Sequence, residues 1–365
     1  MKQWKQSVLG CMTAGLLMMT SFPVFAADSS SDPSGKSQPV TEGSTFDDGT
    51  LTYTILKNMQ VSVTGCITTA TNISIMPKID GYTVVSIGDQ AFAGCSALQS
   101  VTMPNGITEI GDGAFQSCTS LQSVTLSNSI TEIPDGAFLS CSALTDIQLG
   151  DQITKIGRMA FAYCTSLTDM EIPDSVTEFG EQTFMGCSSL ESITLPETLE
   201  TLSAYMFQNC SALESFSIPD TMTDLGYLAF VGCRNLKTIA ISANHPTYQL
   251  QDDVLYSKDG TELFLYPAGK TGTSFTVPDG VKTISDGAFF AAPLQSVTLP
   301  EGLERIGSGA FDYCTSLTNI TIPESVTVIQ DHAFSDCESL SSVLFAGDEE
   351  ATDNALQIGS YAFFC

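Results

Sequence analysis

Apolar residues return to the same relative positions at one fixed interval over much of the chain, the interval that separates Phe92 from Phe115. The clearest marker is a phenylalanine that is usually followed, three positions later, by a cysteine. These phenylalanines are Phe92, Phe115, Phe138, Phe161, Phe184, Phe207 and Phe230 and, after an interruption, Phe289, Phe311 and Phe334. A fixed period of about 20–50 residues is typical of a solenoid, in which each repeat forms one coil stacked on the next. The pattern therefore predicts a repeat solenoid, and its extended surface favours binding over catalysis.

Within one unit, such as Leu98 to Cys118, the order is Leu-x-x-Val-x-Leu-Pro, then Ile, Ile-Gly and Ala-Phe-x-x-Cys, with small substitutions. The alternation in Val-x-Leu predicts a short strand with one face inward. Proline cannot donate the next ladder hydrogen bond, so it ends the strand. A second extended segment follows, glycines such as Gly111 and Gly180 turn the chain, and Ala-Phe-x-x-Cys fits a single helical turn. The fold class is thus mainly short β-strands with single helical turns.

The chain begins with the features of a secretory signal peptide, predicted over residues 1–26. Lys2 and Lys5 precede an apolar stretch, and Val24-Phe25-Ala26 offers small residues for cleavage before Ala27. Residues 27–45 are rich in Ser, Asp, Pro and Gly, which predicts a flexible leader. No later segment is long and apolar enough to cross a membrane, so we expect an exported chain with no membrane insertion of its mature form.

The rest of the chain divides by its repeat pattern. Strand-like alternation at Leu51–Ile55 and Val61–Thr64 predicts an N-terminal β cap over residues 46–80. Leucine-rich repeats are expected over 81–240 and 276–365, with the array ending in mid-repeat. Between them, residues 241–275 form an irregular repeat, because the interval from Phe230 to Phe289 is longer than two repeat lengths. Two apolar runs separated by Asp259-Gly260 predict a β-hairpin there, which we expect to project from the solenoid edge.

Nine of the eleven cysteines that follow the predicted signal peptide share one phase of the repeat. In stacked coils they would form a column with Cβ atoms about 4.8 Å apart, whereas a disulfide needs about 3.5–4.5 Å and side chains turned toward each other. Buried free thiols are therefore expected along the column. Cys66 and Cys365 lie off the column, and their redox state is left open.

Charge and motif content restrict the function. The formal net charge is −28, with 13 Lys and Arg against 41 Asp and Glu, which argues against nucleic acid and anionic lipid as partners. Gly269-Lys270-Thr271 lacks the preceding glycine of a phosphate-binding loop. The two histidines, His245 and His332, are far apart in sequence, which disfavours a metal centre or a catalytic triad. We expect no enzymatic activity, no metal and no cofactor.

The repeat Ile-Pro-x-x-Val-x-x-Ile-Gly-x-x-Ala-Phe-x-x-Cys-x-x-Leu, seen at 172–190 and 322–340 with small substitutions, resembles the leucine-rich repeats of the BspA-like family of bacterial surface proteins. The resemblance covers about residues 50–365. It implies a right-handed leucine-rich-repeat superhelix, secreted or on the cell surface, that acts as an adhesion or protein-binding module through its concave sheet. The family carries no ligand motif that can be transferred residue by residue.

The candidate binding residues are the outward positions of the predicted concave strands, with an acidic patch at Asp146, Asp169 and Glu171, and two tyrosines of the predicted hairpin. The full set is Ser123, Thr125, Asp146, Gln148, Asp169, Glu171, Ser192, Thr194, Tyr256 and Tyr266. Few aromatic residues are expected to face outward, which favours a protein ligand, with polysaccharide as the alternative. The family resemblance implies that such a protein ligand is a host matrix or cell-surface protein. Two other functions remain open: a structural spacer, or a targeting module for an enzyme domain beyond residue 365.

Overall fold

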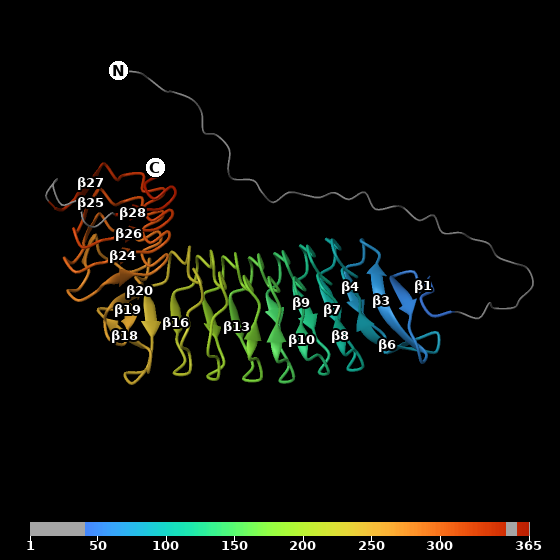
Figure 1. The fold of residues 1–365 in the computed structure, drawn as a ribbon. Helices are drawn as coiled ribbons and strands as arrows, with labels where there is room; N and C mark the ends of the chain where they lie inside the picture. The colour runs from blue at the N-terminus through green and yellow to red at the C-terminus, as the bar shows by residue number, and fades with distance from the viewer. Residues whose placement is uncertain (1–40, 348–355, 365) are drawn as a thin grey trace, which may run out of the picture. The chain divides into compact units, whose positions relative to one another are not determined.

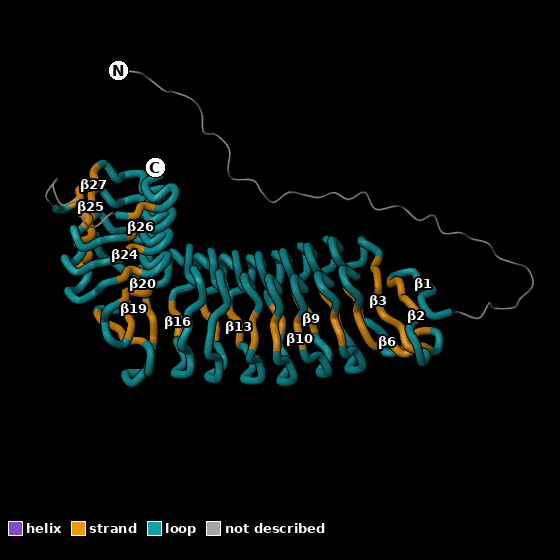
Figure 2. Tube along the Cα trace, in the orientation of Figure 1, coloured by secondary structure: helices purple, strands orange, loops and turns teal. Residues whose placement is uncertain are grey.

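The computed structural model describes residues 41–347 and 356–364. The predicted signal peptide, residues 27–40 of the predicted leader and Cys365 lie outside the described residues. Figure 1 shows the strands of successive coils lying side by side along the array, and Figure 2 shows strands and loops in this part of the chain but no helix. No described helix, accordingly, has the length and apolar character of a membrane span.

The N-terminal strands begin the stack, and both strands expected from the sequence alternation are confirmed. The sheet order is β1-β2-β3-β6-β5. These strands are β1 (Thr45–Asp47), β2 (Leu51–Ile55), β3 (Gln60–Cys66), β5 (Lys78–Ile79) and β6 (Tyr82–Ile87). The first three pair antiparallel, but β3 pairs parallel to β6, which starts the parallel coils. Backbone hydrogen bonding to β2 begins within the predicted leader, because Gly43 N donates to Ile55 O at 2.9 Å.

Each regular coil contributes a short strand of the Val-x-Leu segment to what we call the Ser/Thr sheet. Neighbouring strands pair in parallel and in repeat register, for example Val101 with Val124. The sheet has four parts, β4-β7-β9-β11, β13-β15, β16-β17 and β21-β23-β25-β27. The bounds are β4 (Asn72–Ser74), β7 (Ser100–Thr102), β9 (Ser123–Thr125), β11 (Asp146–Ile147), β13 (Asp169–Glu171), β15 (Ser192–Thr194), β16 (Ser215–Ser217), β17 (Thr238–Ala240), β21 (Ser274–Thr276), β23 (Ser296–Thr298), β25 (Asn319–Ile322) and β27 (Ser342–Phe345).

A second parallel ladder is built by the Ile-Ile-Gly segments. Its strands are mostly very short, since the glycine turn follows at once. In the N-terminal coils they are β8 (Glu109–Ile110), β10 (Glu132–Ile133), β12 (Lys155–Ile156) and β14 (Glu178–Phe179). In the C-terminal coils they continue the inserted strands β18 (Tyr248–Gln251), β19 (Val254–Ser257) and β20 (Glu262–Leu265) as β22 (Thr283–Ile284), β24 (Arg305–Ile306), β26 (Val328–Ile329) and β28 (Gln357–Ile358).

The predicted helical turn at Ala-Phe-x-x-Cys is wrong. The positions two before and two after the phenylalanine have left-handed backbone, as at Gly113 (φ 59°) and Ser117 (φ 60°). This alternation directs every second N–H to the next coil, so Phe115 N donates to Ala137 O at 2.8 Å. The rings stack in consequence, with Phe115 and Phe138 centroids 5.3 Å apart and 6° from parallel. The ladder thus replaces helical hydrogen bonding by bonding between coils.

The cysteine column is buried, and free thiols are found, as the spacing predicts, at Cys118, Cys141, Cys164, Cys187, Cys210, Cys233 and Cys314. Each of these donates to the carbonyl of the phenylalanine one coil back, for example Cys141 Sγ to Phe115 O at 3.1 Å. Burial raises the pKa of the Cys118 thiol to about 12. Cys95 departs from the prediction, because it forms a disulfide with Cys66. Cys66 ends β3 in the cap, so coil spacing does not restrict its approach.

The predicted hairpin is confirmed, since β19 and β20 pair antiparallel, but its expected projection from the edge is wrong. Tyr256 and Tyr266 are each only 2% exposed and therefore offer no contact surface. Alternate residues of β19 enter two separate hydrophobic cores: Leu255 joins the core of the preceding coils, and Val254 and Tyr256 join the core that follows. The hairpin is therefore the structural joint between two stacks.

Tyr266 takes the place of a column phenylalanine. It lies one repeat length before Phe289 in the sequence, its N–H donates to Ala288 O at 2.8 Å, and its ring lies 5.3 Å from that of Phe289. The extra residues of the irregular repeat consequently all fall between Phe230 and Tyr266.

One carboxyl in the C-terminal stack should make stability depend on pH. Burial, followed by the negative charge of Asp336, raises the pKa of Asp312 to about 7, and Asp312 Oδ1 is buried with no hydrogen-bond partner among the described residues. A folded-state pKa above the unfolded value of 3.8 means that this contribution to stability is complete below about pH 4 and is lost as pH rises through 7. We expect Asp312→Asn to raise the free energy of unfolding at pH 8 by about 1–2 kcal/mol, allowing for solvent screening, with little change at pH 4.

Urea titrations at pH 4 and pH 8 measure this difference, with the exposed Asp279→Asn as the control. An Asp312→Asn variant whose stability follows the parent protein at both pH values would contradict the prediction.

Candidate binding surface

The Ser/Thr sheet is interrupted between β11 and β13, beside the acidic patch expected from the sequence. A cavity of about 470 Å³ lies at this interruption. We call it the acidic hollow, and its polar lining includes Asp146, Gln148, Asp151, Asp169 and Glu171. Asp146 and Asp169 occupy equivalent positions in adjacent coils, and like charges placed opposite each other oppose strand pairing. The sequence and the structure thus agree on where acidic side chains gather.

The sheet is also interrupted between β15 and β16. The equivalent residues there are Ser192 and Ser215, and the structure gives no electrostatic reason for that break. Charge repulsion therefore accounts for the first interruption only.

The carboxylates of the hollow have no basic partner among the residues that the structure describes. In residues 41–347 and 356–364, no ion pair involves Asp146, Asp169 or Glu171. All three are exposed, and Asp169 accepts a hydrogen bond from Thr168 Oγ1 at 3.0 Å. A partner that brings positive charge to this surface would find acceptors that remain free to bind it.

The remaining predicted residues lie on the strands that flank the hollow. Thr125 on β9 and Ser192 and Thr194 on β15 are exposed, and Ser123 is half-buried. The structure therefore brings Asp146, Gln148, Asp169 and Glu171 to one cavity and places the hydroxyl residues one coil away on either side. Tyr256 and Tyr266 belong to neither group, because they are in the core of the joint.

Asp151 is a lining residue that the sequence analysis missed. It follows Gly150, which stands where most repeats carry proline. The missing proline was the feature of the sequence that could have drawn attention to Asp151, because without proline the chain leaves the strand differently. Asp151 adds a fourth carboxylate to the hollow.

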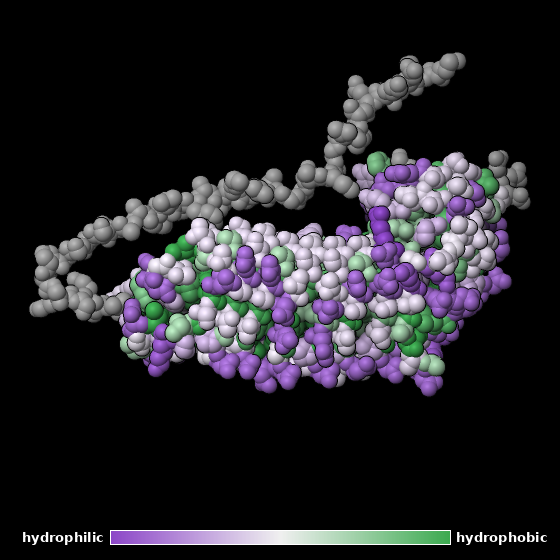
Figure 3. All heavy atoms as spheres, turned by 180° about the vertical axis from the view of Figure 1, so that it is seen from behind, coloured by the Kyte–Doolittle hydropathy of each residue, from purple (hydrophilic) through white to green (hydrophobic). Residues whose placement is uncertain are grey.

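The two histidines lie in different environments. His245 is fully buried, and its Nε2 donates to Pro219 O at 3.0 Å while Nδ1 accepts from Thr247 N and Tyr248 N. His332 is exposed. Within the part of the chain that the structure describes, no three His, Cys, Asp or Glu side chains are placed to share a metal ion. Figure 3 shows hydrophilic residues gathered along the lower edge of one face, with paler residues along its upper edge.

Comparison with known proteins agrees with this architecture. The profile of the BspA type leucine rich repeat region matches six copies, over residues 68–187, 154–258 and 264–365. The chain belongs to the BspA-type leucine-rich-repeat family. Among curated proteins, no sequence matches this BspA-type chain.

Two solved structures of leucine-rich-repeat proteins resemble the chain over most of its length. A leucine rich cell surface protein from Faecalibacterium prausnitzii is 28% identical, with a TM-score of 0.69, covering 86% of this chain and 97% of that chain. A leucine-rich repeat protein from Bacteroides ovatus is 27% identical, with a TM-score of 0.57, covering 87% and 91%. A pneumococcal vaccine antigen, at 21% identity and a TM-score of 0.57, covers 88% and 86% and shares the fold. This BspA-type chain is thus similar to bacterial leucine-rich-repeat proteins.

Proposed function

We propose that this protein is secreted or displayed on a bacterial cell surface, where it binds a protein ligand through the Ser/Thr sheet. The observation that carries the proposal is the acidic hollow, whose exposed carboxylates have no basic partner in the described part of the protein. The ligand surface that fits it is basic. The parallel ladders hold the sheet in one geometry, so little conformational entropy is lost on binding.

Two further observations support the location and the mode of action. The similar Faecalibacterium protein is described as a cell surface protein. The Cys66–Cys95 disulfide suits an oxidising compartment, where such bonds persist. The protein has no catalytic role in this function. The family resemblance supports a host matrix or cell-surface protein as the ligand.

The test is binding of the purified protein to a panel of host matrix proteins, mucin and bacterial wall polysaccharide. The Asp146→Lys/Asp169→Lys/Glu171→Lys variant should bind its protein ligand at least about tenfold more weakly, since charged contacts contribute about 1.5–3 kcal/mol each. Binding by the parent protein should also weaken as salt is raised.

The matched control is Glu109→Lys/Glu197→Lys/Glu200→Lys, which changes the net charge equally at exposed carboxylates outside the hollow. An equal loss of affinity in both variants would mean that binding depends only on the overall charge, and the hollow would then be rejected as the site. A folded parent protein that binds nothing on the panel would favour the structural spacer instead.

A further inference from the structure

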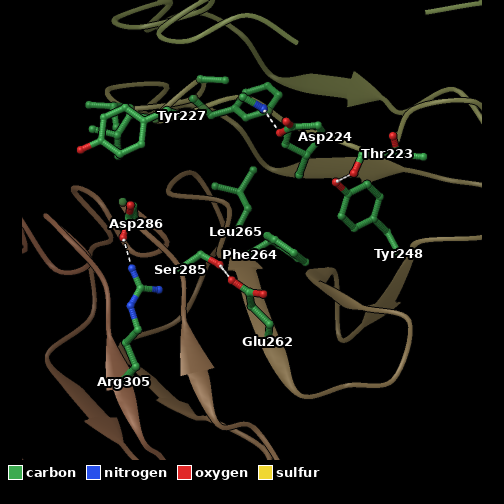
Figure 4. Close-up of a pocket in the computed structure, with 17 residues that line it drawn as sticks. Thr223, Asp224, Tyr227, Tyr248, Glu262, Phe264, Leu265, Ser285, Asp286 and Arg305 are labelled. Atoms are coloured by element: carbon green, nitrogen blue, oxygen red, sulfur yellow. Dashed lines mark hydrogen bonds and ion pairs between the residues drawn. The ribbon is translucent and has the colours of Figure 1, made fainter. Parts of the chain in front are cut away.

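A second cavity, of about 300 Å³, lies at the joint between the two cores, away from the acidic hollow. Residues 223–231 form one side, and the strands β20, β22 and β24 with their following turns form much of the other (Figure 4). The cavity exists because the inserted strands separate the two stacks of aromatic rings. The first stack ends at Phe230, and the second begins at Tyr266. We call it the joint pocket.

One wall of the joint pocket is apolar. It is lined by five half-buried residues, Leu225, Leu228, Phe230, Phe264 and Leu265. Four of these side chains pack against the core of the preceding coils while remaining partly accessible. A ligand with a hydrocarbon stem would remove this apolar surface from water, which favours binding.

Three carboxylates line the pocket, those of Asp224, Glu262 and Asp286, and two of them have an oxygen that accepts no hydrogen bond from the described residues. Asp286 Oδ1 accepts from Arg305 Nη2 at 3.1 Å and from Ser308 N at 2.8 Å. Glu262 uses only Oε1, which accepts from Ser285 Oγ at 2.6 Å. Asp224 uses only Oδ1, which accepts from Gly226 N at 2.9 Å. Glu262 Oε2 and Asp224 Oδ2 therefore have no hydrogen-bond donor among the described residues.

Among the residues that the structure describes, Arg305 is the one cationic residue that lines the pocket, and its guanidinium already has partners in the protein. Arg305 pairs with Asp286 and also donates to Gln330 Oε1 at 2.5 Å. Figure 4 shows the Arg305 guanidinium directed to Asp286, with Glu262 bonded to Ser285 and Asp224 on the opposite side. With three carboxylates and one guanidinium, the pocket disfavours anions and attracts a cation.

We propose that the joint pocket binds an arginine side chain of a partner protein. The aliphatic stem of that arginine would lie on Phe264 and Leu265, and its guanidinium would donate to Glu262 and Asp224. Tyr227, 45% exposed, lines the same pocket and offers a ring face for stacking. A planar guanidinium with several donors matches two carboxylates and an aromatic ring better than the compact ammonium of lysine. This site is separate from the Ser/Thr sheet and does not depend on its function.

The probe is the peptide acetyl-Gly-Ser-Arg-Ser-Gly-amide, titrated into the whole protein and followed by NMR shifts of the Leu225 and Leu265 methyl groups. Matched peptides carry lysine or citrulline in place of arginine. The citrulline peptide has nearly the same shape without the charge and should bind at least about tenfold more weakly. The lysine peptide should fall between the two.

The protein variants are Glu262→Gln and Asp224→Asn, which keep side-chain size, with Asp279→Asn as an exposed control outside the pocket. Each pocket variant should weaken arginine binding at least about tenfold while the control leaves it unchanged. The Asp146→Lys/Asp169→Lys/Glu171→Lys variant should retain binding at the joint, which separates this proposal from the one for the hollow. Equal affinity for arginine and citrulline, or shifts confined to the acidic hollow, would overturn the proposal, and the peptide comparison needs no variant to fold.

Discussion

Phe161→Ala is expected to lower the free energy of unfolding by about 3–5 kcal/mol, the range for truncating a fully buried aromatic side chain. The Phe161 ring is completely buried and lies between two others, 5.4 Å from Phe138 and 5.7 Å from Phe184. Alanine would remove two stacking contacts at once and leave a cavity that regularly spaced coils cannot close. Urea denaturation followed by circular dichroism measures the change.

The effect should also be local. Each coil of a solenoid contacts mainly its neighbours, so amide hydrogen exchange should accelerate in the coils of Phe138 and Phe184. Exchange around Phe311, which belongs to the other core, should change little. The control is Tyr163→Ala, an exposed aromatic residue of the same turn, which should cost about 1 kcal/mol or less. A loss below about 1 kcal/mol for Phe161→Ala would show that the column contributes little to stability.

The sequence predicts the coils well because the period is itself a physical constraint. Residues of one phase must stack, so the buried phenylalanine and cysteine columns follow from spacing alone. The same rule, applied to Tyr266 at one repeat length before Phe289, would have placed this tyrosine in the core. Its position escapes the sequence analysis because the extra residues of the irregular repeat are assigned there to a projecting hairpin.

Other features have no signal in the period. Cys66 lies in the cap, outside the repeat, so its disulfide with Cys95 depends on how the cap folds onto the first coil. The absence of a helical turn from the described coils depends on backbone conformation at variable positions such as Ser117, which the repeat motif does not specify. For the binding surface, the equivalent phases of Asp146 and Asp169 predict the gathered charge, whereas the interrupted sheet and its cavity require the three-dimensional pairing.

The recurring glycines show that the sequence spacing identifies a required residue, whereas the structure explains why that residue is required. Gly111, Gly157, Gly180, Gly226 and Gly307 share a repeat position that the sequence predicts to turn the chain. Of these, only Gly226 has a positive φ, of 67°. At Gly180 the requirement is close approach instead, because a Cβ there would overlap the backbone nitrogen of Arg158 and lie 2.6 Å from the carbonyl carbon of Gly157.

Gly180→Ala is therefore expected to lower the free energy of unfolding by about 2–3 kcal/mol, since the added methyl meets backbone atoms rather than a side chain that can rotate away. Its matched control is Gly150→Ala, where a Cβ would meet no atom within 4 Å and the backbone is not left-handed. That change should be neutral within about 0.5 kcal/mol or slightly stabilising, because alanine reduces the entropy of the unfolded chain. Urea titrations of the two variants measure both effects. Equal stabilities would mean that the coils can separate at Gly180 at little cost, and the contact between backbones would then not be what requires glycine at this position.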